Sequence, residues 1–341
     1  MRIALDALGG DFGAKPNVLG ALKAVEDFGF DVILVGDSNL IKRELDAAGE
    51  YDESKISIIH APEFIDMAAS PARECRSKKN ASIVVCADLV KTGKADAMIS
   101  AGNSGATMVA GLFGLGRIKG IDRPAIASPM PTQRGVSLVV DAGANADCKA
   151  INLLQFAVMG SIYSNIAYGV ASPLVGLLSI GEEEGKGNLL VKEVTKHIKN
   201  LGINYYGNIE GRDVHTGMID VVVCDGFVGN IVLKLSEGLS KSLFEMIKKE
   251  IKKRPLAMLG ALMAKPAFRA IKNETNPDTY GGAPLLGVNG PVIICHGKSN
   301  EVAIYNSIRV AGRLVHSNAV KVISEAVKSL GPVFDKIKEE E

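Results

Sequence analysis

The sequence predicts an α/β fold in which helices cover both faces of a central, mostly parallel sheet. Short apolar segments alternate along the 341 residues with longer helical ones, which is the pattern of repeated β-α-β units. Glycine is abundant at 37 residues, whereas Trp is absent and aromatic residues make up only 5%. Hydrophobic residues reach 47%, enough for a large core. We therefore expect a three-layer α/β/α architecture.

Strands are predicted where apolar segments of about three to seven residues end in a polar or glycine-containing turn. They are Ile3–Ala7, Val32–Val35, Ile56–His60, Ala97–Ile99, Ala125–Pro129, Val136–Val140, Leu174–Ile180, Asp220–Cys224 and Val292–Cys295. Helical periodicity predicts helices that end near residues 27, 48, 91, 115, 168, 199 and 251, and a last one over about 301–330 with a frayed acidic tail at 339–341. No polar linker separates independent domains, so we expect one domain over 1–341 with a helical protrusion at about 235–285.

Whole-chain composition excludes several classes of function. The net charge is +1 and basic residues are not interleaved with aromatic ones, which argues against nucleic-acid binding. The five cysteines lack C-x-x-C spacing and the five histidines lack metal-ligand spacing, so we expect reduced thiols and no metal. The start lacks the features of a signal peptide, and no apolar run approaches the ~20 residues of a membrane span. The sequence predicts a cytoplasmic protein.

One strand-to-helix turn has the composition of an anion site. The segment Asp96–Thr107 reads DAMISAGNSGAT, in which Asn103, Ser104 and Gly105 begin the helix. Glycine lets the backbone approach a ligand closely, and Asn103 or Ser104 can cap the helix. Free N–H groups at the start of a helix attract anions. The alternative is an ordinary strand-to-helix turn.

Two later turns have the same design. Asp141–Asn145 reads DAGAN and Asp225–Asn230 reads DGFVGN, which contains Gly226 and Gly229. Ligands of parallel sheets bind beyond the carboxyl ends of the strands, so we expect all three turns to face one edge of the sheet. Asp6 and Asp11 flank an earlier glycine turn, where turn formation is slightly favoured over ligand binding.

Lysines at two places in the chain are candidates for neutralising an anion. Lys78 and Lys79 lie with Arg73 and Arg76 directly before a helix, where a solvated basic face is an equal alternative. Lys186 lies among glycines in GEEEGKGN, although the spacing is not that of a P-loop. No G-x-G-x-x-G follows the first strand, so a nicotinamide site is not predicted.

The segment from Lys252 to Lys272 differs in composition from the rest of the chain. It carries apolar residues between basic ends, including Leu256, Leu259, Leu262 and Met263. Its length is insufficient to span a bilayer, but it fits an amphipathic hairpin that rests on an anionic membrane. A dimer-packing arm is the alternative, and both roles are compatible.

The chain resembles the bacterial acyl-acyl-carrier-protein:phosphate acyltransferases of phospholipid synthesis. The resemblance runs in one order along nearly the whole chain, with Leu8 and Ser104 as conservative departures. The matching segments are DALGGD at 6–11, ISAGNSGA at 99–106, DAGAN at 141–145, SIGEEEGKG at 179–187, DGFVGN at 225–230, YGGAPLLG at 280–287 and HG at 296–297.

The resemblance implies that orthophosphate attacks the thioester of a long-chain acyl group carried on acyl carrier protein. It implies a Rossmann-like fold similar to phosphotransacetylases and to the isocitrate dehydrogenase group, a homodimer, and no cofactor. It also implies that a membrane glycerol-3-phosphate acyltransferase uses the acyl phosphate, which would give the amphipathic segment a purpose at the membrane surface.

These implications assign roles to the candidate residues. Phosphate would bind at Asn103, Ser104 and the neighbouring N–H groups, Lys186 would neutralise phosphate or the oxyanion, and Asn230 would donate a hydrogen bond to the oxyanion. His296 is a weaker candidate for protonating the leaving thiolate, and a structural histidine is its alternative. We assign the other residues of the three turns and the two lysines to substrate binding: Gly105, Asp141, Asn145, Asp225, Gly226, Gly229, Lys78 and Lys79.

Two competing functions use the same features. A phosphate acetyltransferase would take acetyl-coenzyme A in place of a carrier-protein thioester. A non-enzymatic scaffold would bind acyl carrier protein and a membrane without turnover, although small polar residues at three strand ends argue against it. The basic group around Lys78 and Lys79 also fits an acidic carrier protein by charge.

Overall fold

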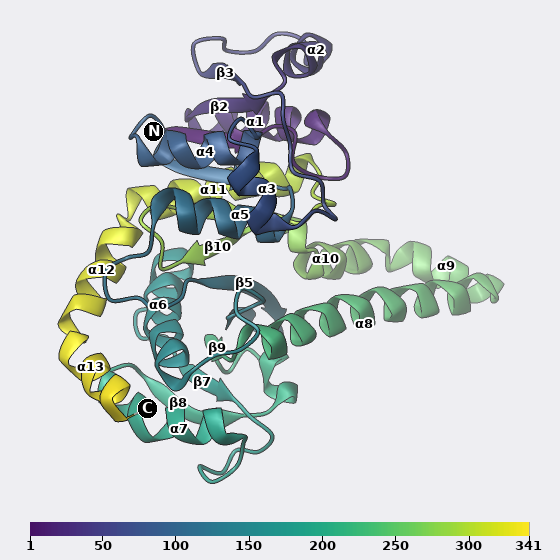
Figure 1. The fold of residues 1–341 in the computed structure, drawn as a ribbon. Coiled ribbons are helices and arrows are strands. Elements are labelled where there is room, and N and C mark those ends of the chain that lie inside the picture. Colours follow the sequence, from purple (N-terminus) through teal and green to yellow (C-terminus); the bar gives the residue numbers. More distant parts are fainter. Residues whose placement is uncertain (341) are drawn as a thin grey trace.

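A continuous eleven-stranded sheet forms the centre of the computed structural model, which describes residues 1–340 (Figure 1). The strands are β1 (Arg2–Asp6), β2 (Asp31–Gly36), β3 (Ile56–His60), β4 (Ala97–Ser100), β5 (Ala125–Thr132), β6 (Gly135–Val140), β7 (Val175–Leu178), β8 (Tyr205–Ile209), β9 (Val221–Val223), β10 (Ala283–Leu286) and β11 (Val292–Ile294). Their order in the sheet is β3-β2-β1-β4-β11-β10-β5-β6-β9-β7-β8.

Helices cover both faces of this sheet. They are α1 (Ala14–Phe28), α2 (Ser38–Ala48), α3 (Pro71–Ser77), α4 (Ser82–Lys91), α5 (Ser104–Ala110), α6 (Ala150–Tyr168), α7 (Leu189–His197), α8 (Gly226–Lys252), α9 (Pro255–Met263), α10 (Lys265–Thr275), α11 (Glu301–His316), α12 (Ala319–Ser329) and α13 (Gly331–Glu340). The turn Gly111–Leu115 continues α5 as a π-helix, and Ile198–Leu201 and Pro277–Thr279 are short 3₁₀ segments. The expected α/β architecture with a mostly parallel sheet and a helical protrusion is confirmed.

Alternating residues of the strands supply separate cores on the two faces. In β1, Ile3 and Leu5 join the core beneath α1, α6 and α11, whereas Ala4 joins the core beneath α3, α4 and α5. Successive side chains of a strand point to opposite faces, so both faces of such a strand must be apolar. This requirement explains the continuous apolar segments from which the strands were predicted.

Strand direction reverses within the sheet. The pairs β11–β10, β10–β5 and β5–β6 are antiparallel, whereas the other pairs are parallel. After three reversals, β6, β9, β7 and β8 run opposite to β1, β2, β3, β4 and β11. The turn at Asn103 therefore lies in one half of the sheet, and the turns at Asn145 and Asn230 lie in the other. Because the sheet also twists between β4 and β9, strand direction alone does not put the turns on opposite sides, and the expectation that all three face one edge stays a prediction.

Strands β8 and β10, helices α3 and α13 and one helix break are not among the predicted elements. Strand β10 is short and contains Pro284, and β8 at the outer edge carries Gly207 and polar residues. Arg73 and Arg76, expected directly before a helix, lie within α3. The single helix expected over 301–330 is divided into α11 and α12 at Asn318, whose φ of 51° is left-handed. The expected frayed tail includes Glu341, which lies outside the described residues, while Glu339 and Glu340 belong to α13.

Helix α6 is the central core helix. It is the one helix within residues 1–340 that is long and apolar enough to cross a membrane, but 72% of that stretch is buried inside the protein. Leu154 and Phe156 are fully buried, and α6 packs against both α12 and α7. Helices α12 and α13 then run along the side of the molecule, so that the C-terminal end of the chain lies near α7 (Figure 1).

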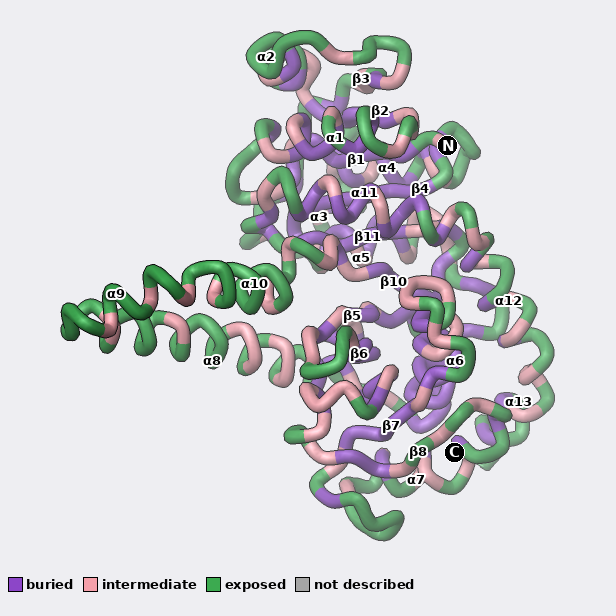
Figure 2. Tube along the Cα trace, turned by 180° about the vertical axis from the view of Figure 1, so that it is seen from behind, coloured by how far each residue is buried: buried purple, intermediate pink, exposed green. Residues whose placement is uncertain are grey.

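Helices α8, α9 and α10 form an arm that projects from the body (Figure 1). The start of α8 is buried at Gly226 and Gly229, but α9 and α10 contain no buried residue. Figure 2 shows the arm as exposed and intermediate along its length, in contrast to the buried strands. Leu256 and Met263 are each 85% exposed, and Leu259 and Leu262 are similarly open to solvent. The arm is thus an apolar surface without a partner in the single chain.

We expect the same Leu→Ala substitution to lower the free energy of unfolding in the core but not in the arm. Leu154→Ala removes a fully buried side chain and is expected to lower the free energy of unfolding by about 2–5 kcal/mol. Leu256→Ala removes an exposed one and is expected to change it by less than about 0.5 kcal/mol. Urea unfolding of both variants in the absence of lipid measures the difference. A comparable loss for Leu256→Ala would mean that another surface covers the arm in solution.

Candidate active site

The turns that follow β1 and β4 line a cavity of about 150 Å³. Asp6, Gly9, Gly102 and Asn103 line it from the strand ends, and the loop 64–67 closes its other side. A Cβ at Gly9 would lie 2.7 Å from the backbone nitrogen of Gly102. Only glycine allows these two turns to touch, and their contact shapes the floor of the cavity.

Asp6 is the buried charge of this cavity. Its carboxylate accepts hydrogen bonds from Ser82 Oγ at 2.6 Å and Ser100 Oγ at 2.7 Å, and Ser100 Oγ accepts one from the backbone of Gly102 at 3.0 Å. Burial raises the pKa of Asp6, and the hydrogen bonds oppose that shift. Asp6 thus fixes the turn that follows β4. The two serines were not singled out from the sequence, because nothing local shows that Ser82 reaches β1.

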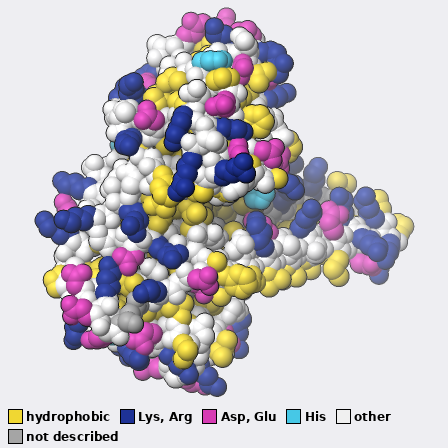
Figure 3. Space-filling model, in the orientation of Figure 1, with side chains coloured by type: hydrophobic (Ala, Val, Ile, Leu, Met, Phe, Trp, Pro, Cys, Tyr) yellow, Lys and Arg dark blue, Asp and Glu magenta, His cyan; other side chains and the backbone are white. Residues whose placement is uncertain are grey.

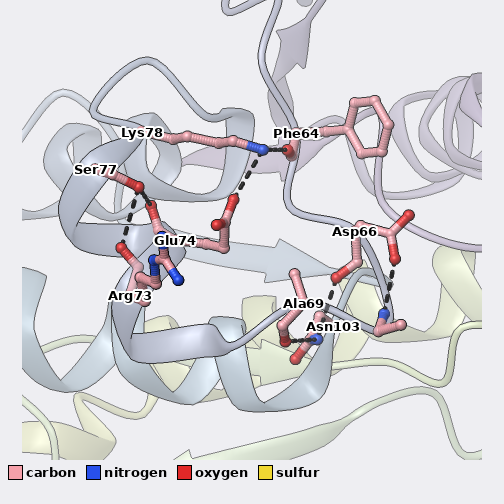
Figure 4. A network of polar contacts seen from close by, with 9 residues as sticks. Phe64, Asp66, Ala69, Arg73, Glu74, Ser77, Lys78 and Asn103 are labelled. Carbon is pink, nitrogen blue, oxygen red and sulfur yellow. Dashed lines mark hydrogen bonds and ion pairs between the residues drawn. The ribbon is translucent and has the colours of Figure 1, made fainter.

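Asn103 is buried and holds a neighbouring loop in place. Its Oδ1 accepts from Ala106 N at 3.0 Å and so caps α5, as expected. Its Nδ2 donates to the carbonyls of Met67 at 2.9 Å, Asp66 at 3.3 Å and Ala69 at 3.4 Å, and Figure 4 shows the last two of these bonds. The side-chain amide is therefore fully engaged. At this turn, the exposed Ser104 and the first N–H groups of α5 are the groups available to an anion.

The two lysines beside this cavity differ in their surroundings. Lys78 Nζ lies 2.9 Å from the carboxylate of Glu74 and donates to the carbonyl of Phe64 at 3.3 Å (Figure 4). The hydrogen bond to Glu74 raises the pKa of Lys78. Lys78 therefore has a compensating carboxylate and supports the loop that lines the cavity. Lys79 is exposed, and its charge opposes the burial effect on the pKa of Cys75.

His296 follows β11 at the same edge of the sheet. It is exposed, and its Nδ1 accepts a hydrogen bond from the backbone of Lys298 at 3.1 Å. The next residue, Gly297, accepts a hydrogen bond from Asp11 N at 2.7 Å. The structure thus places the His296 loop against the Gly10–Asp11 turn, beside the cavity that contains Asp6.

A second cluster lies at the carboxyl ends of β6 and β9, in the other half of the sheet. Its centre is Asp141, which is fully buried. Its carboxylate accepts from Ile126 N at 3.0 Å, Gly143 N at 3.1 Å and Ala144 N at 3.0 Å. The backbone of Asn145 donates to it at 2.7 Å and the Asn145 amide at 2.8 Å. With five donors around it, Asp141 organises its turn; burial still raises its pKa.

Asn145 joins the second and third turns. Its Nδ2 donates to Pro124 O at 2.7 Å, and its carbonyl accepts from Gly226 N at 2.8 Å. Asp225 caps α8 by accepting from Val228 N at 2.8 Å. A Cβ at Gly229 would lie 1.9 Å from the carbonyl oxygen of Asp141. Asp141, Asn145 and Asp225 therefore use their polar groups to join β6, β9 and α8.

Asn230 and Lys186 have the exposed polar groups at this edge. Asn230 lies in the first turn of α8 and is exposed, with its Cβ 3.5 Å from the position that a Cβ on Gly143 would take. Lys186 is exposed in the loop after β7, where its N–H donates to Glu183 O at 2.9 Å. Since β7 and β9 are parallel neighbours, this loop and the third turn share an edge.

The candidate residues thus form two groups. Asn103, Ser104, Lys78 and His296 belong to the half of the sheet that contains β1, and Asn230 and Lys186 belong to the half that contains β6. Figure 3 shows the surface hollowed between these two halves, beside the base of the arm. A ligand that contacts both groups would have to lie between the halves.

Close packing around Gly229 predicts opposite effects for two Gly→Ala substitutions on α8. Gly229→Ala places a methyl group against the Asp141 backbone and is expected to cost several kcal/mol of stability. Gly238→Ala meets no atom within 4 Å and should stabilise the helix by roughly 0.5–1 kcal/mol. Thermal unfolding of both variants measures these changes. Equal melting temperatures would contradict the proposed junction of α8 with the second turn.

Sequence comparison places the chain among enzymes that transfer acyl groups to phosphate. Residues 1–322 match the model of a family described as fatty acid synthesis protein. A phosphate acyltransferase from Elusimicrobium minutum is 59% identical over 337 residues, which cover 99% of each chain. One from Pelotomaculum thermopropionicum is 50% identical over 330 residues, which cover 97% of this chain and 96% of that protein.

Solved structures agree on the fold. A phosphotransacetylase from Streptococcus pyogenes superposes with a TM-score of 0.64 at 18% identity, covering 93% of this chain and 94% of the other. A branched-chain phosphotransacylase from Enterococcus faecalis gives a TM-score of 0.55 at 17% identity over 92% of this chain and 99% of the other. These likenesses show a shared Rossmann-like α/β fold. Together with the sequence matches, they identify the chain as an acyltransferase that belongs to the phosphate acyltransferase family.

Proposed function

We propose that the protein transfers a long-chain acyl group from acyl carrier protein to orthophosphate, and that the acyl phosphate enters phosphatidic acid synthesis. The observation that carries this proposal is 59% identity to a phosphate acyltransferase over nearly the whole of both chains. The carrier-protein donor follows from the family resemblance of the motifs described above. A membrane glycerol-3-phosphate acyltransferase is the proposed consumer of the product.

The reaction needs positioning more than nucleophile activation. A phosphate oxygen attacks the thioester carbonyl carbon, and the carbonyl oxygen becomes an oxyanion in the tetrahedral intermediate. The carbon–sulfur bond then breaks, the carbonyl re-forms, and the carrier-protein thiolate leaves and takes up a proton. Phosphate is already anionic at neutral pH, so no Ser-His-Asp triad is required. The protein must hold two anionic or polar groups together and stabilise the oxyanion.

The exposed groups of the two clusters fit these tasks. Ser104 and the first N–H groups of α5 would bind phosphate at the strand ends next to the Asp6 cavity. Lys186 would neutralise phosphate or the oxyanion, and Asn230 would donate a hydrogen bond to the oxyanion. His296 lies at the rim of the cavity, where it is available to protonate the thiolate. In this proposal the reacting centre lies between the two halves of the sheet.

Asp141, Asn145 and Asp225 support this centre indirectly. Their hydrogen bonds fix the turn and the helix start from which Asn230 projects. Asn103 does the same for Ser104 by capping α5 and holding the loop 64–67. The glycines at 105, 226 and 229 are proposed to give the backbone its close approach to substrate or to neighbouring turns.

Removal of the proposed oxyanion contacts should reduce turnover without unfolding the protein. Lys186→Ala and Asn230→Ala are each expected to lower turnover by ~10²–10³-fold, the usual effect of one lost oxyanion donor. Both side chains are exposed, so melting temperatures should stay close to the parent. Lys192→Ala and Asn200→Ala on or after α7 are matched controls, since both are exposed. Near-normal turnover in both site variants would refute the assignment.

The assay itself decides between the competing functions. Free carrier-protein thiol is measured after incubation with palmitoyl-acyl carrier protein, with and without orthophosphate, and acyl phosphate is trapped with hydroxylamine. Phosphate-dependent release supports the proposal. Turnover of acetyl-coenzyme A alone would indicate a phosphate acetyltransferase, and carrier binding without release would indicate a scaffold.

The apolar arm is proposed to contact the membrane. Leu256, Leu259, Leu262 and Met263 are exposed, and lysines and arginines flank this segment on both sides. Such a surface inserts its apolar side chains at the lipid interface while its cations meet anionic head groups. Packing of two arms in a homodimer is the other proposed role. Delivery of a long-chain acyl phosphate at the membrane surface is compatible with both membrane contact and packing of two arms in a homodimer.

A charge reversal on the arm tests the membrane role. Leu259→Glu combined with Leu262→Glu should abolish flotation with anionic liposomes, because it places carboxylates in the inserted surface. Val302→Glu combined with Val322→Glu changes the charge equally on exposed apolar positions of α11 and α12 and should float as the parent does. Size-exclusion chromatography checks that both variants keep the parent's oligomeric state. Undiminished flotation of the arm variant in that state would refute the membrane role.

A further inference from the structure

A second cavity lies far along the chain from both catalytic clusters, where α6 and α11 meet the segment that follows α10. Its volume is about 40 Å³. Tyr163 and Tyr168 line it from α6, Arg309 and Arg313 line it from α11, and Tyr280 closes it. None of these residues belongs to the groups around Asp6 or Asp141, and the proposed reaction does not use them.

The two arginines place positive charge here, and among residues 1–340 no carboxylate forms an ion pair with either of them. Arg309 Nη2 donates to Thr279 O at 3.2 Å, and Arg313 Nη1 donates to Ala167 O at 3.0 Å. Both partners are neutral carbonyls. Arg309 Nε is buried and has no hydrogen-bond partner. Burial and the neighbouring Arg313 lower the pKa of Arg309. A buried donor without a partner and two like charges four residues apart on a helix are both unfavourable.

The tyrosines that line the cavity add hydroxyl groups, which can donate hydrogen bonds, to the positive charge of the two arginines. Burial raises the pKa of Tyr163 and of Tyr168, so both phenols keep their protons at neutral pH. Their rings lie edge to face at 6.4 Å. The hydroxyl group of Tyr280 donates a hydrogen bond to the backbone carbonyl of Glu274 at 2.6 Å, which fixes the tyrosine ring beside the cavity. Guanidinium and phenol groups around one space are complementary to an oxyanion.

We propose that this cavity binds the oxyanion head of a small ligand, either a carboxylate or a phosphoryl group, between Arg309 and Arg313. A volume of about 40 Å³ holds roughly three waters at ~10–15 Å³ each, so it admits a head group and leaves the rest of a larger ligand outside. The anion supplies the negative charge that both guanidinium groups lack.

An anion bound in this cavity would stabilise the segment where the arm returns to the body of the protein. The chain leaves α10 at Thr275 and re-enters the sheet at β10 through Thr279 and Tyr280. Arg309 already bonds Thr279, and an anion beside it would connect α11, α6 and this segment through one charge. Binding should therefore stabilise the folded protein in proportion to its occupancy.

Tyrosine fluorescence offers a direct readout, because the protein has no Trp and three of its seven tyrosines line the cavity. The probes are sodium acetate and sodium phosphate, titrated against sodium chloride at equal ionic strength, with melting temperature as the second readout. A saturable response to acetate identifies a carboxylate site, and one to phosphate alone identifies a phosphoryl site. Absence of a saturable response to both refutes the proposal.

Substitutions of the two arginines test whether the anion that changes the tyrosine fluorescence binds in this cavity. Arg309→Gln combined with Arg313→Gln should weaken the apparent affinity at least tenfold, and Arg43→Gln, on the exposed surface of α2, should leave it unchanged. An unchanged titration of the double variant would show that the anion binds elsewhere, including at the proposed active site. If the double variant does not fold, Arg313→Gln and Tyr168→Phe alone decide, since Arg313 is exposed and Tyr168→Phe removes a single hydroxyl. Parent-like titration of both single variants overturns the proposal.

Discussion

Two buried aspartates, one in each half of the sheet, fix the turns on which the proposed chemistry depends. Asp6 ends β1 and receives the hydroxyl groups of Ser82 and Ser100. Asp141 follows β6 and receives four backbone N–H groups and the amide of Asn145. A buried carboxylate is costly unless it is surrounded by donors. These donors reach the carboxylate when the turns adopt the observed conformation. Another conformation would leave the buried carboxylate without hydrogen bonds, so burial of the aspartate favours the observed turns.

The rigid groups and the reactive groups of the site are therefore different residues. Asn103, Asp141, Asn145 and Asp225 hydrogen-bond to neighbouring backbone groups, and we propose that they position the turns while other residues contact the substrate. The exposed side chains Ser104, Lys186 and Asn230 project from the turns that these residues fix. Precise placement of a few donors on rigid turns is what stabilisation of an oxyanion needs, because donors aligned in advance lose little freedom during the reaction.

The arm represents the opposite case, an apolar surface with little packing of its own. Its helices add scarcely any burial to the single chain, so the stability of the body does not explain its leucines and methionines. An exposed apolar surface of this kind indicates contact with lipid or with another protein. The proposed anion site lies where the arm returns to the body, so it would add to the hydrogen bonds that join this segment to α11.

The sequence by itself determined the local features of this protein. Apolar segments located nine of the strands, and the composition of the turns at Asn103, Asn145 and Asn230 identified the strand ends that carry the candidate site, because these signals are read from neighbouring residues. Only the tertiary structure showed that three antiparallel pairings around β10 and β5 divide the sheet into two halves, with Asn103 in one and Asn145 and Asn230 in the other. It also showed that Ser82 supports Asp6 from 76 residues away, and that Asn103 is already engaged. Strand direction and long-range hydrogen bonds depend on which distant segments pair, and no short stretch of sequence contains that information.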